Sequence, residues 1–277
     1  MSSLENALSI LRCFAADTPE LTVSQVSVRL GMPKSTVSRL MKTMNESGVL
    51  EQNRSTRRYT PGFLAFQLGS LYRHHLKTSE LADLAVTELV QRFGLTGYLC
   101  VLDGADVVVL KVKQGRYPVR FVVPEGRRLP ACTTAVGMTL LARLKDEELR
   151  SIHPPVVHYP PTGMHMPIEE VLAELQRVRE QKWAEVDERT FAGFGAIAVA
   201  VGDAAGSQAL AFSLSYPMNV LTSELHDAMV SHLVAAARRI GRKSGDAFWS
   251  DEPGEPEPGE PFLTARVEQA LKVLNGP

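Results

Sequence analysis

The chain has 277 residues, of which 44% are hydrophobic, and a formal net charge of −1 at pH 7, which leaves room for one small and one moderate-sized core. Its most apolar run, Ala196 to Val201, is far too short to span a bilayer, and no signal peptide is evident around Glu5. We therefore expect no membrane partner. Three scattered cysteines form no paired framework, which predicts a protein of the reducing cytoplasm.

The first fifty residues predict three helices. Ser3 to Ala15 places apolar side chains at helical spacing. Thr22 and Gln25 form a capping box that begins a second helix. Gly31 then supplies a turn, and the third helix, Pro33 to Asn45, begins with a proline where a missing N–H costs nothing. This pattern predicts a helix-turn-helix whose third helix enters the major groove of duplex DNA.

The polar face of the third helix carries the hydroxyl and cationic groups that base edges and phosphates require. A basic stretch, Glu51 to Gly62, follows and predicts a two-stranded wing with arginines near its tip. The expected DNA contacts are Lys34, Ser35, Thr36, Ser38, Arg39, Lys42, Arg54, Arg57 and Arg58. Ser35, Thr36 and Arg39 are expected at base edges, and Lys34, Lys42, Arg57 and Arg58 at phosphates.

Charge is distributed unevenly along the chain. Residues 1–76 hold nine Lys and Arg against five acids, a net charge of +4. The rest of the chain therefore has a net charge of −5, which gives the total of −1. DNA affinity is therefore expected to be local, salt-sensitive and modest for each subunit, and dimerisation would compensate for this. Phe63 to His75 predicts an amphipathic connector helix that packs either on its twin from another subunit or on its own domain.

From Ser79 onward the pattern predicts a domain of helices and a largely antiparallel sheet, giving an α+β chain. The expected helices are Ser79 to Phe93 with Gly94 as its cap, Val136 to Leu144, Ile168 to Trp183, and Ser223 to about Lys243. The expected strands are Tyr98 to Leu102 and Val107 to Val112 around an Asp103-Gly104 hairpin, then Val119 to Val123, Ala196 to Val201 and Leu210 to Ser215.

The C-terminal part has a different composition. Asp251 to Pro261 has five acids and four prolines in eleven residues, which predicts an extended linker. Phe262 to Leu274 is weakly amphipathic and either docks or stays disordered. The expected organisation is a winged helix-turn-helix domain at 1–61, a connector at 62–78, an effector domain at 79–246, and an acidic, Pro-rich linker and tail at 247–277.

The whole arrangement resembles the IclR family of transcriptional regulators over residues 3–245. The likeness is carried by GMPKSTVSRLMKTMNESGVLEQN, RLPACTTAVGMTLLARL, DERTFAGFGAIAVAV and ALAFSLSYP. The resemblance implies a GAF-like effector domain, a homodimer or homotetramer, a double-stranded DNA operator, and a pocket for a small metabolite, often an organic or aromatic acid.

The resemblance also assigns the expected effector-binding residues: Arg120, Cys132, Thr134, Ala135, Gly137, Met138, Asp187, Glu188, Ala196, Ser213 and Ser215. Backbone N–H groups of Thr134, Ala135 and Gly137 are expected to hold a carboxylate, and Arg120, on the strand expected at Val119 to Val123, is a candidate partner for an acid. Cys132, Met138 and Ala196 replace a histidine, a lysine and a cysteine that are common in the family. The effector is therefore expected to be less polar than glyoxylate or pyruvate.

Two alternatives are a metabolite-processing enzyme and a metal-sensing regulator. Gly193 to Ala198 fits the letters GxGxxA but lacks the strand before it and the helix after it that a dinucleotide site needs. Cys132 has no histidine at a recognisable spacing. His153, His158 and His165 are expected in a Pro-rich loop, and His226 and His232 are six residues apart rather than four. No catalytic residue, metal or cofactor is therefore expected.

Overall fold

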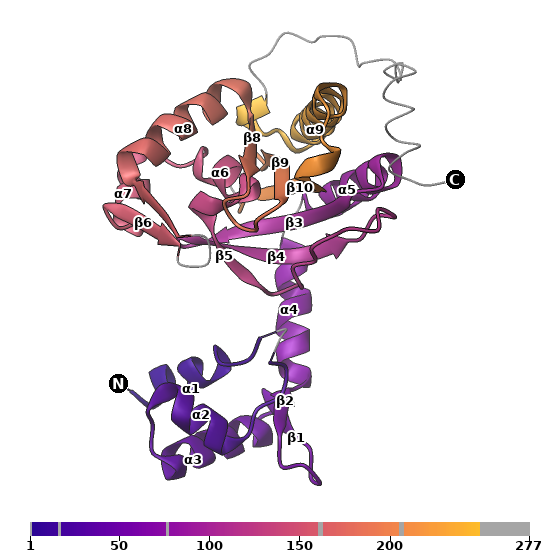
Figure 1. Ribbon diagram of the computed structural model, residues 1–277. Coiled ribbons are helices and arrows are strands. Elements are labelled where there is room, and N and C mark those ends of the chain that lie inside the picture. Colours follow the sequence, from indigo (N-terminus) through magenta and orange to yellow (C-terminus); the bar gives the residue numbers. More distant parts are fainter. Residues whose placement is uncertain (1, 16–17, 76–77, 160–162, 205–207, 250–277) are drawn as a thin grey trace. The chain divides into compact units, whose positions relative to one another are not determined.

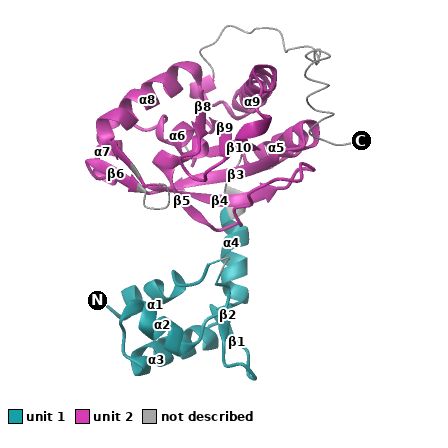
Figure 2. Ribbon diagram, in the orientation of Figure 1, with its two compact units in different colours: residues 1–76 teal, residues 77–277 magenta. Residues whose placement is uncertain are grey.

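The structure is a computed structural model that describes residues 2–15, 18–75, 78–159, 163–204 and 208–249 (Figure 1). The chain divides into two compact units, Met1–Leu76 and Lys77–Pro277 (Figure 2). Within the described ranges, no helix combines the length and the apolar character needed to cross a bilayer. The segment expected as an amphipathic tail, Phe262 to Leu274, lies outside the described residues.

The first unit is a helix-turn-helix followed by a short hairpin and a helix. Its elements are α1 (Ser3–Leu11), α2 (Val23–Leu30), α3 (Lys34–Glu46), β1 (Leu50–Gln52), β2 (Tyr59–Pro61) and α4 (Phe63–His75). The Thr22–Gln25 capping box forms, and Gly31 ends α2 in the left-handed conformation at φ 63°. Strands β1 and β2 pair antiparallel, with Glu51 opposite Thr60, as the two-stranded wing requires.

Helix α1 ends at Leu11, earlier than the expected Ala15. The N–H groups of Cys13 and Phe14 bond to the carbonyl oxygens three residues before them, which tightens the chain into a turn. Arg29 of α2 also donates to the Cys13 carbonyl oxygen at 3.0 Å. The helix is therefore replaced by a turn that is fastened to α2.

The core of the first unit lies where the helices meet the wing. Its fully buried side chains include Ile10, Leu21, Val26, Val37, Met41 and Leu50. Gly62 joins the wing to α4 at a close approach of two backbones, because a Cβ there would lie 2.4 Å from the carbonyl oxygen of Gly48.

The second unit is a six-stranded antiparallel sheet in the order β5-β4-β3-β10-β9-β8. Its strands are β3 (Thr96–Asp103), β4 (Asp106–Lys113), β5 (Arg128–Pro130), β8 (Trp183–Asp187), β9 (Phe194–Val201) and β10 (Leu210–Pro217). Its helices are α5 (Ser79–Phe93), α6 (Ala135–Leu141), α7 (Asp146–Ile152), α8 (Ile168–Gln181) and α9 (Ser223–Ser244), and a separate hairpin is formed by β6 (Val156–Tyr159) and β7 (Met164–Pro167).

Helices cover both faces of this sheet. Alternate residues of the central strands, among them Ala198, Ala200 and Ala211, share a hydrophobic cluster with α6 and α8. The other face is covered by α5 and α9: Val86 and Val90 of α5 lie against Gly97 of β3. The largely antiparallel sheet expected from the hairpin pattern is confirmed.

The structure of this unit differs from the expectation at five points. Val119 to Val123 is a loop, and the edge strand is β5 instead, because the N–H of Val123 bonds to the Tyr98 hydroxyl rather than to a strand. The expected Pro-rich histidine loop contains β6 and β7, in which His158 lies opposite His165. The expected helix Ile168 to Trp183 ends at Gln181 because Lys182 is left-handed, at φ 67°, and Trp183 begins β8.

The other two differences concern the helices after β5. Helix α6 begins at Ala135 and ends at Leu141, three residues short of the expected Leu144, since the chain turns there through bonds from Arg143 and Leu144 to carbonyl oxygens three residues earlier. Helix α7, which was not expected, follows with three acids in its first turn.

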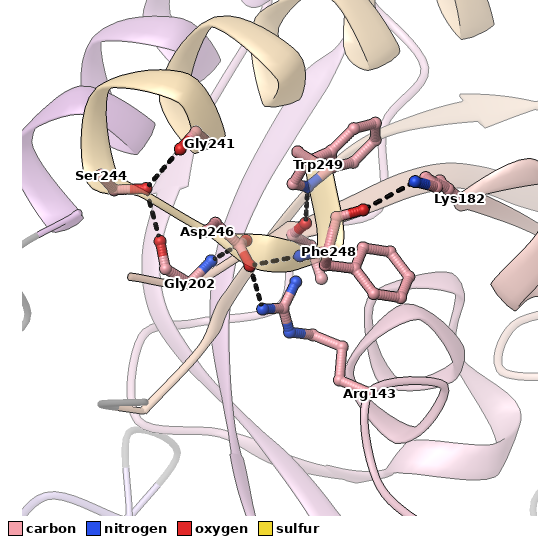
Figure 3. A network of polar contacts seen from close by, with 9 residues as sticks. Arg143, Lys182, Gly202, Gly241, Ser244, Asp246, Phe248 and Trp249 are labelled. Atoms are coloured by element: carbon pink, nitrogen blue, oxygen red, sulfur yellow. Dashed lines mark hydrogen bonds and ion pairs between the residues drawn. The ribbon is translucent and has the colours of Figure 1, made fainter. Parts of the chain in front are cut away.

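The C-terminal end of the described chain is fastened to the second unit (Figure 3). Asp246 is 2% exposed, pairs with Arg143 at 2.7 Å, and accepts the N–H of Gly202 at 2.6 Å. Trp249 is buried, and its indole N–H donates to the carbonyl oxygen of Ala200 at 2.8 Å. Residues 247–249, which were expected in the linker and tail, therefore pack as part of the second unit.

Candidate functional site

The polar face of α3 is set by the way the helix is buried. Val37, Met41 and Met44 face the core, so the residues between them are turned outward. Of the nine expected DNA contacts, Thr36 and Arg58 are half-buried and seven are exposed: Lys34, Ser35, Ser38, Arg39, Lys42, Arg54 and Arg57. With 13 residues, α3 is about 20 Å long, and a helix of this kind is narrow enough to enter the major groove.

The tip of the wing is a tight turn that presents arginines. The Asn53 side-chain oxygen accepts the N–H groups of Ser55 and Thr56, at 3.0 and 3.2 Å. Arg57 is left-handed, at φ 58°, and its N–H donates to the Asn53 carbonyl oxygen. This turn leaves Arg54 and Arg57 exposed at its surface.

Two of the expected phosphate contacts are already paired in this structure. Arg58 lies 3.5 Å from Glu20, and Lys42 lies 3.7 Å from Glu46 one helical turn away. Within the described ranges, the cations of the expected set that make no ion pair are Lys34, Arg39, Arg54 and Arg57. These four residues can therefore approach DNA without giving up an acidic partner.

A cavity of about 610 Å³, counting the open space at its mouth, lies in the second unit between the sheet, the start of α6 and two loops. Its lining includes five of the eleven expected effector residues, Thr134, Ala135, Ala196, Ser213 and Ser215. The other six, Arg120, Cys132, Gly137, Met138, Asp187 and Glu188, are not among the described residues that line it.

Gly137 and its neighbours serve the packing of α6 rather than the cavity. The Gly137 N–H, expected to hold a carboxylate, donates to the Thr134 hydroxyl at 3.0 Å, and a Cβ on Gly137 would lie 2.1 Å from the Ala131 carbonyl oxygen. Met138 and Cys132 are buried in the core, with the Cys132 thiol 3.7 Å from a ring nitrogen of His153. Burial raises the pKa of Cys132 to about 12, so this thiol is not a ready nucleophile.

Arg120 and the acidic pair also lie elsewhere. Arg120 is exposed, donates to the Gly115 carbonyl oxygen at 2.9 Å, and lines a second, smaller cavity of about 200 Å³. Asp187 accepts a hydrogen bond from Tyr216 at 2.9 Å, and burial raises the pKa of this carboxyl. Glu188, at φ 53°, accepts the Gly193 N–H at 2.6 Å and so holds the turn before β9.

Aromatic residues form much of the mouth of the larger cavity. Phe121 was expected to line it, although from a strand rather than a loop, whereas Tyr98, Phe191 and Phe194 were not expected as site residues. The rings of Phe121 and Phe191 lie 3.9 Å apart between centroids, and Phe194 lies 6.2 Å from Phe121. Tyr98 contributes its ring and hydroxyl from β3. Phe191 lies in the loop before β9 and Phe194 is the first residue of β9, so the spacing of residues in the sequence does not show which way these two side chains face.

Comparison with known proteins decides the family. Residues 3–54 match the IclR helix-turn-helix domain, and residues 70–242 match the family described as bacterial transcriptional regulator IclR C-terminal. The chain belongs to the IclR family. Among curated IclR-family relatives, the HTH-type transcriptional regulator XynR of Escherichia coli K12 is 30% identical over 242 residues, which cover 87% of this chain and 94% of XynR. KdgR of Dickeya chrysanthemi is 30% identical over 247 residues, 88% of this chain and 80% of KdgR.

Solved structures of IclR proteins share this fold. A regulator from Silicibacter sp. TM1040 superposes with a TM-score of 0.76 at 22% identity. The match covers 92% of this chain and 99% of the Silicibacter chain. An IclR homolog from Microbacterium hydrocarbonoxydans, complexed with 4-hydroxybenzoate, has a TM-score of 0.75 at 22% identity. The match covers 88% of this chain and 99% of the Microbacterium chain. The resemblance expected from the sequence is thus confirmed, as is the α+β fold.

Membership of the IclR family also sets the class of function. The chain is a transcriptional regulator with a helix-turn-helix DNA-binding domain, and its curated relatives are named as regulators or repressors rather than as enzymes. The enzymatic alternative is therefore not retained.

Proposed function

We propose that this IclR-family chain represses or activates transcription under the control of a small organic molecule bound in the 610 Å³ cavity of its second unit. The observation that carries the proposal is a half-open, largely apolar cavity lined by a few hydroxyl groups, which is the usual character of a small-molecule site. The IclR homolog solved with 4-hydroxybenzoate supports an aromatic ligand in particular.

In this proposal α3 reads the operator. Ser35 and Arg39, exposed on α3, contact base edges, together with the half-buried Thr36. Lys34, Lys42 and the wing arginines Arg54, Arg57 and Arg58 bind phosphates on either side. For Arg58 and Lys42, DNA binding exchanges an acidic partner for a phosphate.

Self-association follows from the surface of α4. Phe63, Phe66, Leu68 and Leu71 are each 57–62% exposed, and the rings of Phe63 and Phe66 stack on one another at 6.0 Å. So many large apolar side chains on one short helix indicate a surface that is covered in the assembled protein. We assign the covering partner to α4 of a second copy, which places two α3 helices on half-sites about one helical turn, roughly 34 Å, apart.

Control by the ligand then requires that the ligand bind two arrangements of the paired heads with different affinities. Helix α4 leads along the chain into α5, which packs on the sheet that carries the cavity, so α4 is the proposed connection between the ligand and the heads.

The test is selection of bound duplexes from random DNA by the full chain, followed by a screen of small molecules for release or capture of the selected duplex. The proposal expects enrichment of one sequence with two half-sites and a response to at least one organic ligand. Enrichment of no sequence would refute the DNA-reading role of α3, and a selected duplex whose affinity no ligand changes would refute control through the cavity.

A further inference from the structure

The larger cavity offers a ligand only one uncommitted hydroxyl proton among its described lining residues. Five side chains bring hydroxyl groups to its wall: Tyr98, Thr134, Thr190, Ser213 and Ser215. Ser213 is 4% exposed, and its hydroxyl makes no hydrogen bond to any part of the chain that the structure describes.

The other four hydroxyl groups donate their protons to backbone carbonyl oxygens. The acceptors are Phe121 for Tyr98 at 2.8 Å, Ala131 for Thr134 at 3.3 Å, Thr133 for Thr190 at 2.6 Å, and Gly195 for Ser215 at 3.2 Å. Since a hydroxyl group has one proton, these four can still accept a hydrogen bond but have none left to donate without breaking an existing bond.

The lining of the cavity also lacks the charged groups that an acid would need. No lysine, arginine or histidine occurs among the described residues that line this cavity, and the thiol of Cys100 stays protonated because burial raises its pKa to about 12. The first turn of α6 also borders the cavity, but α6 has only seven residues, and Thr134 already holds its Gly137 N–H. An ionised carboxylate here would lose its water without gaining a cation, which is unfavourable.

The shape and surface of the lining suit a flat apolar group. Phe121, Phe191 and Phe194 gather their rings at one part of the wall, whereas β9 and α6 contribute the small residues Ala196 and Ala135. Aromatic rings pack favourably against such rings by offset or edge-on contacts.

Within the proposed function, and resting on it, we infer that the ligand is an uncharged aromatic molecule that accepts one hydrogen bond from the Ser213 hydroxyl. Ser213 selects the polar substituent, and the three phenylalanines select the ring. Ser213 lies directly opposite Tyr98 in the β3–β10 ladder, so the two side chains share the face of the sheet that borders the cavity.

Benzamide and benzoate test this inference, because they have nearly the same shape and differ in charge at neutral pH. Isothermal titration calorimetry of the full chain with each probe is expected to show benzamide binding at least about tenfold more tightly than benzoate. Ser213→Ala is expected to weaken benzamide binding about five- to tenfold, the usual worth of one hydrogen bond. Ser215→Ala removes a hydroxyl of the same strand that is already engaged, and should weaken binding less than Ser213→Ala does.

Three results would overturn the inference: benzoate binding as tightly as benzamide, no measurable binding of benzamide, or an unchanged benzamide affinity in Ser213→Ala. Thermal unfolding of both serine variants checks that the sheet is intact. Failure of the proposed function gives a different result, since benzamide would then bind normally while no ligand changed the affinity for the selected duplex.

Discussion

The hydroxyl group of Tyr98 holds the loop at Phe121 by donating to the Phe121 carbonyl oxygen at 2.8 Å. The Tyr98 hydroxyl oxygen also accepts the N–H of Val123 at 3.2 Å, so one side chain of the central strand β3 satisfies two backbone groups of the loop. This loop carries Phe121 to the mouth of the larger cavity. Tyr98 therefore links the rigid sheet to the part of the cavity wall that lacks regular structure.

Tyr98→Phe is expected to lower the free energy of unfolding by about 1–3 kcal/mol, because the N–H of Val123 is left buried without its partner. The loosened loop should also weaken binding of benzamide. Urea denaturation and calorimetry measure the two effects. Tyr117→Phe is the matched control, since the Tyr117 hydroxyl makes no hydrogen bond within the described residues; a loss of equal size there would argue against the role given to Tyr98.

Arg39→Ala and Arg57→Ala separate sequence reading from phosphate binding. Arg39→Ala is expected to cost about 1–3 kcal/mol on the selected duplex and much less on scrambled DNA, because a base contact is lost. Arg57→Ala is expected to weaken both duplexes alike and to reduce the salt dependence of binding by about one unit. Fluorescence anisotropy titrations at several salt concentrations measure both. Equal losses on the two duplexes for Arg39→Ala would contradict its assignment to a base edge.

Asp246→Ala tests the fastening of the C-terminal segment shown in Figure 3. The change leaves Arg143, with 17% of its side chain exposed, without its carboxylate and removes the acceptor of the Gly202 N–H. Removal of one partner from such a buried pair is expected to destabilise the second unit by about 3 kcal/mol.

The fluorescence of Trp249, which packs beside this pair, follows the unfolding in urea. Asp146→Ala breaks an ion pair whose carboxylate is 51% exposed, that with Arg179 at 2.7 Å, and should cost no more than about 1 kcal/mol. If the two variants lost the same stability, the buried pair would have no special role.

Stability should fall as pH decreases through the range in which histidine takes up a proton. Burial lowers the pKa of His153, although Asp106 opposes the shift; burial and then Arg92 lower the pKa of His232, against the Ala228 carbonyl. The unfolded chain therefore binds protons near the ordinary histidine pKa of 6.5 that the folded chain does not bind. Asp187, whose pKa burial raises, acts in the opposite sense in a more acidic range.

The free energy of unfolding is thus expected to be highest above pH 6.5 and to decline as the solution becomes more acidic than this. Urea denaturation over a series of pH values measures the decline. The variants His153→Gln and His232→Gln should each make it shallower. An increase in stability on acidification through this range would contradict the assignment.

Local signals predicted the first unit and its connector well. The capping box at Thr22 and the left-handed Gly31 are short-range features, and the helices Phe63–His75 and Ser79–Phe93 have the predicted bounds. Val119 to Val123 has the apolar character of a strand, but the N–H of Val123 bonds to the hydroxyl group of Tyr98, which lies 25 residues earlier in the sequence. A hydrogen bond between residues so far apart in the sequence cannot be predicted from a local pattern.

The candidate site was predictable only in part, for a related reason. Ser213, Ser215 and Ala196 alternate along strands, so the face that they share follows from the register. Gly137 and Met138 lie on a short, wholly buried helix, where no polar face tells which side meets a cavity. In the aromatic wall, Phe121 and Phe191 lie in loops and Phe194 begins β9, so the directions of these side chains depend on the completed fold.

The most direct test of the central claim is the ratio of dissociation constants of the full chain for its selected duplex and for a scrambled duplex, measured by fluorescence anisotropy at physiological salt. The account predicts that the selected duplex binds at least about a thousandfold more tightly, with the affinity changed by a ligand of the larger cavity. Equal affinities for the two duplexes, with and without ligand, would contradict it.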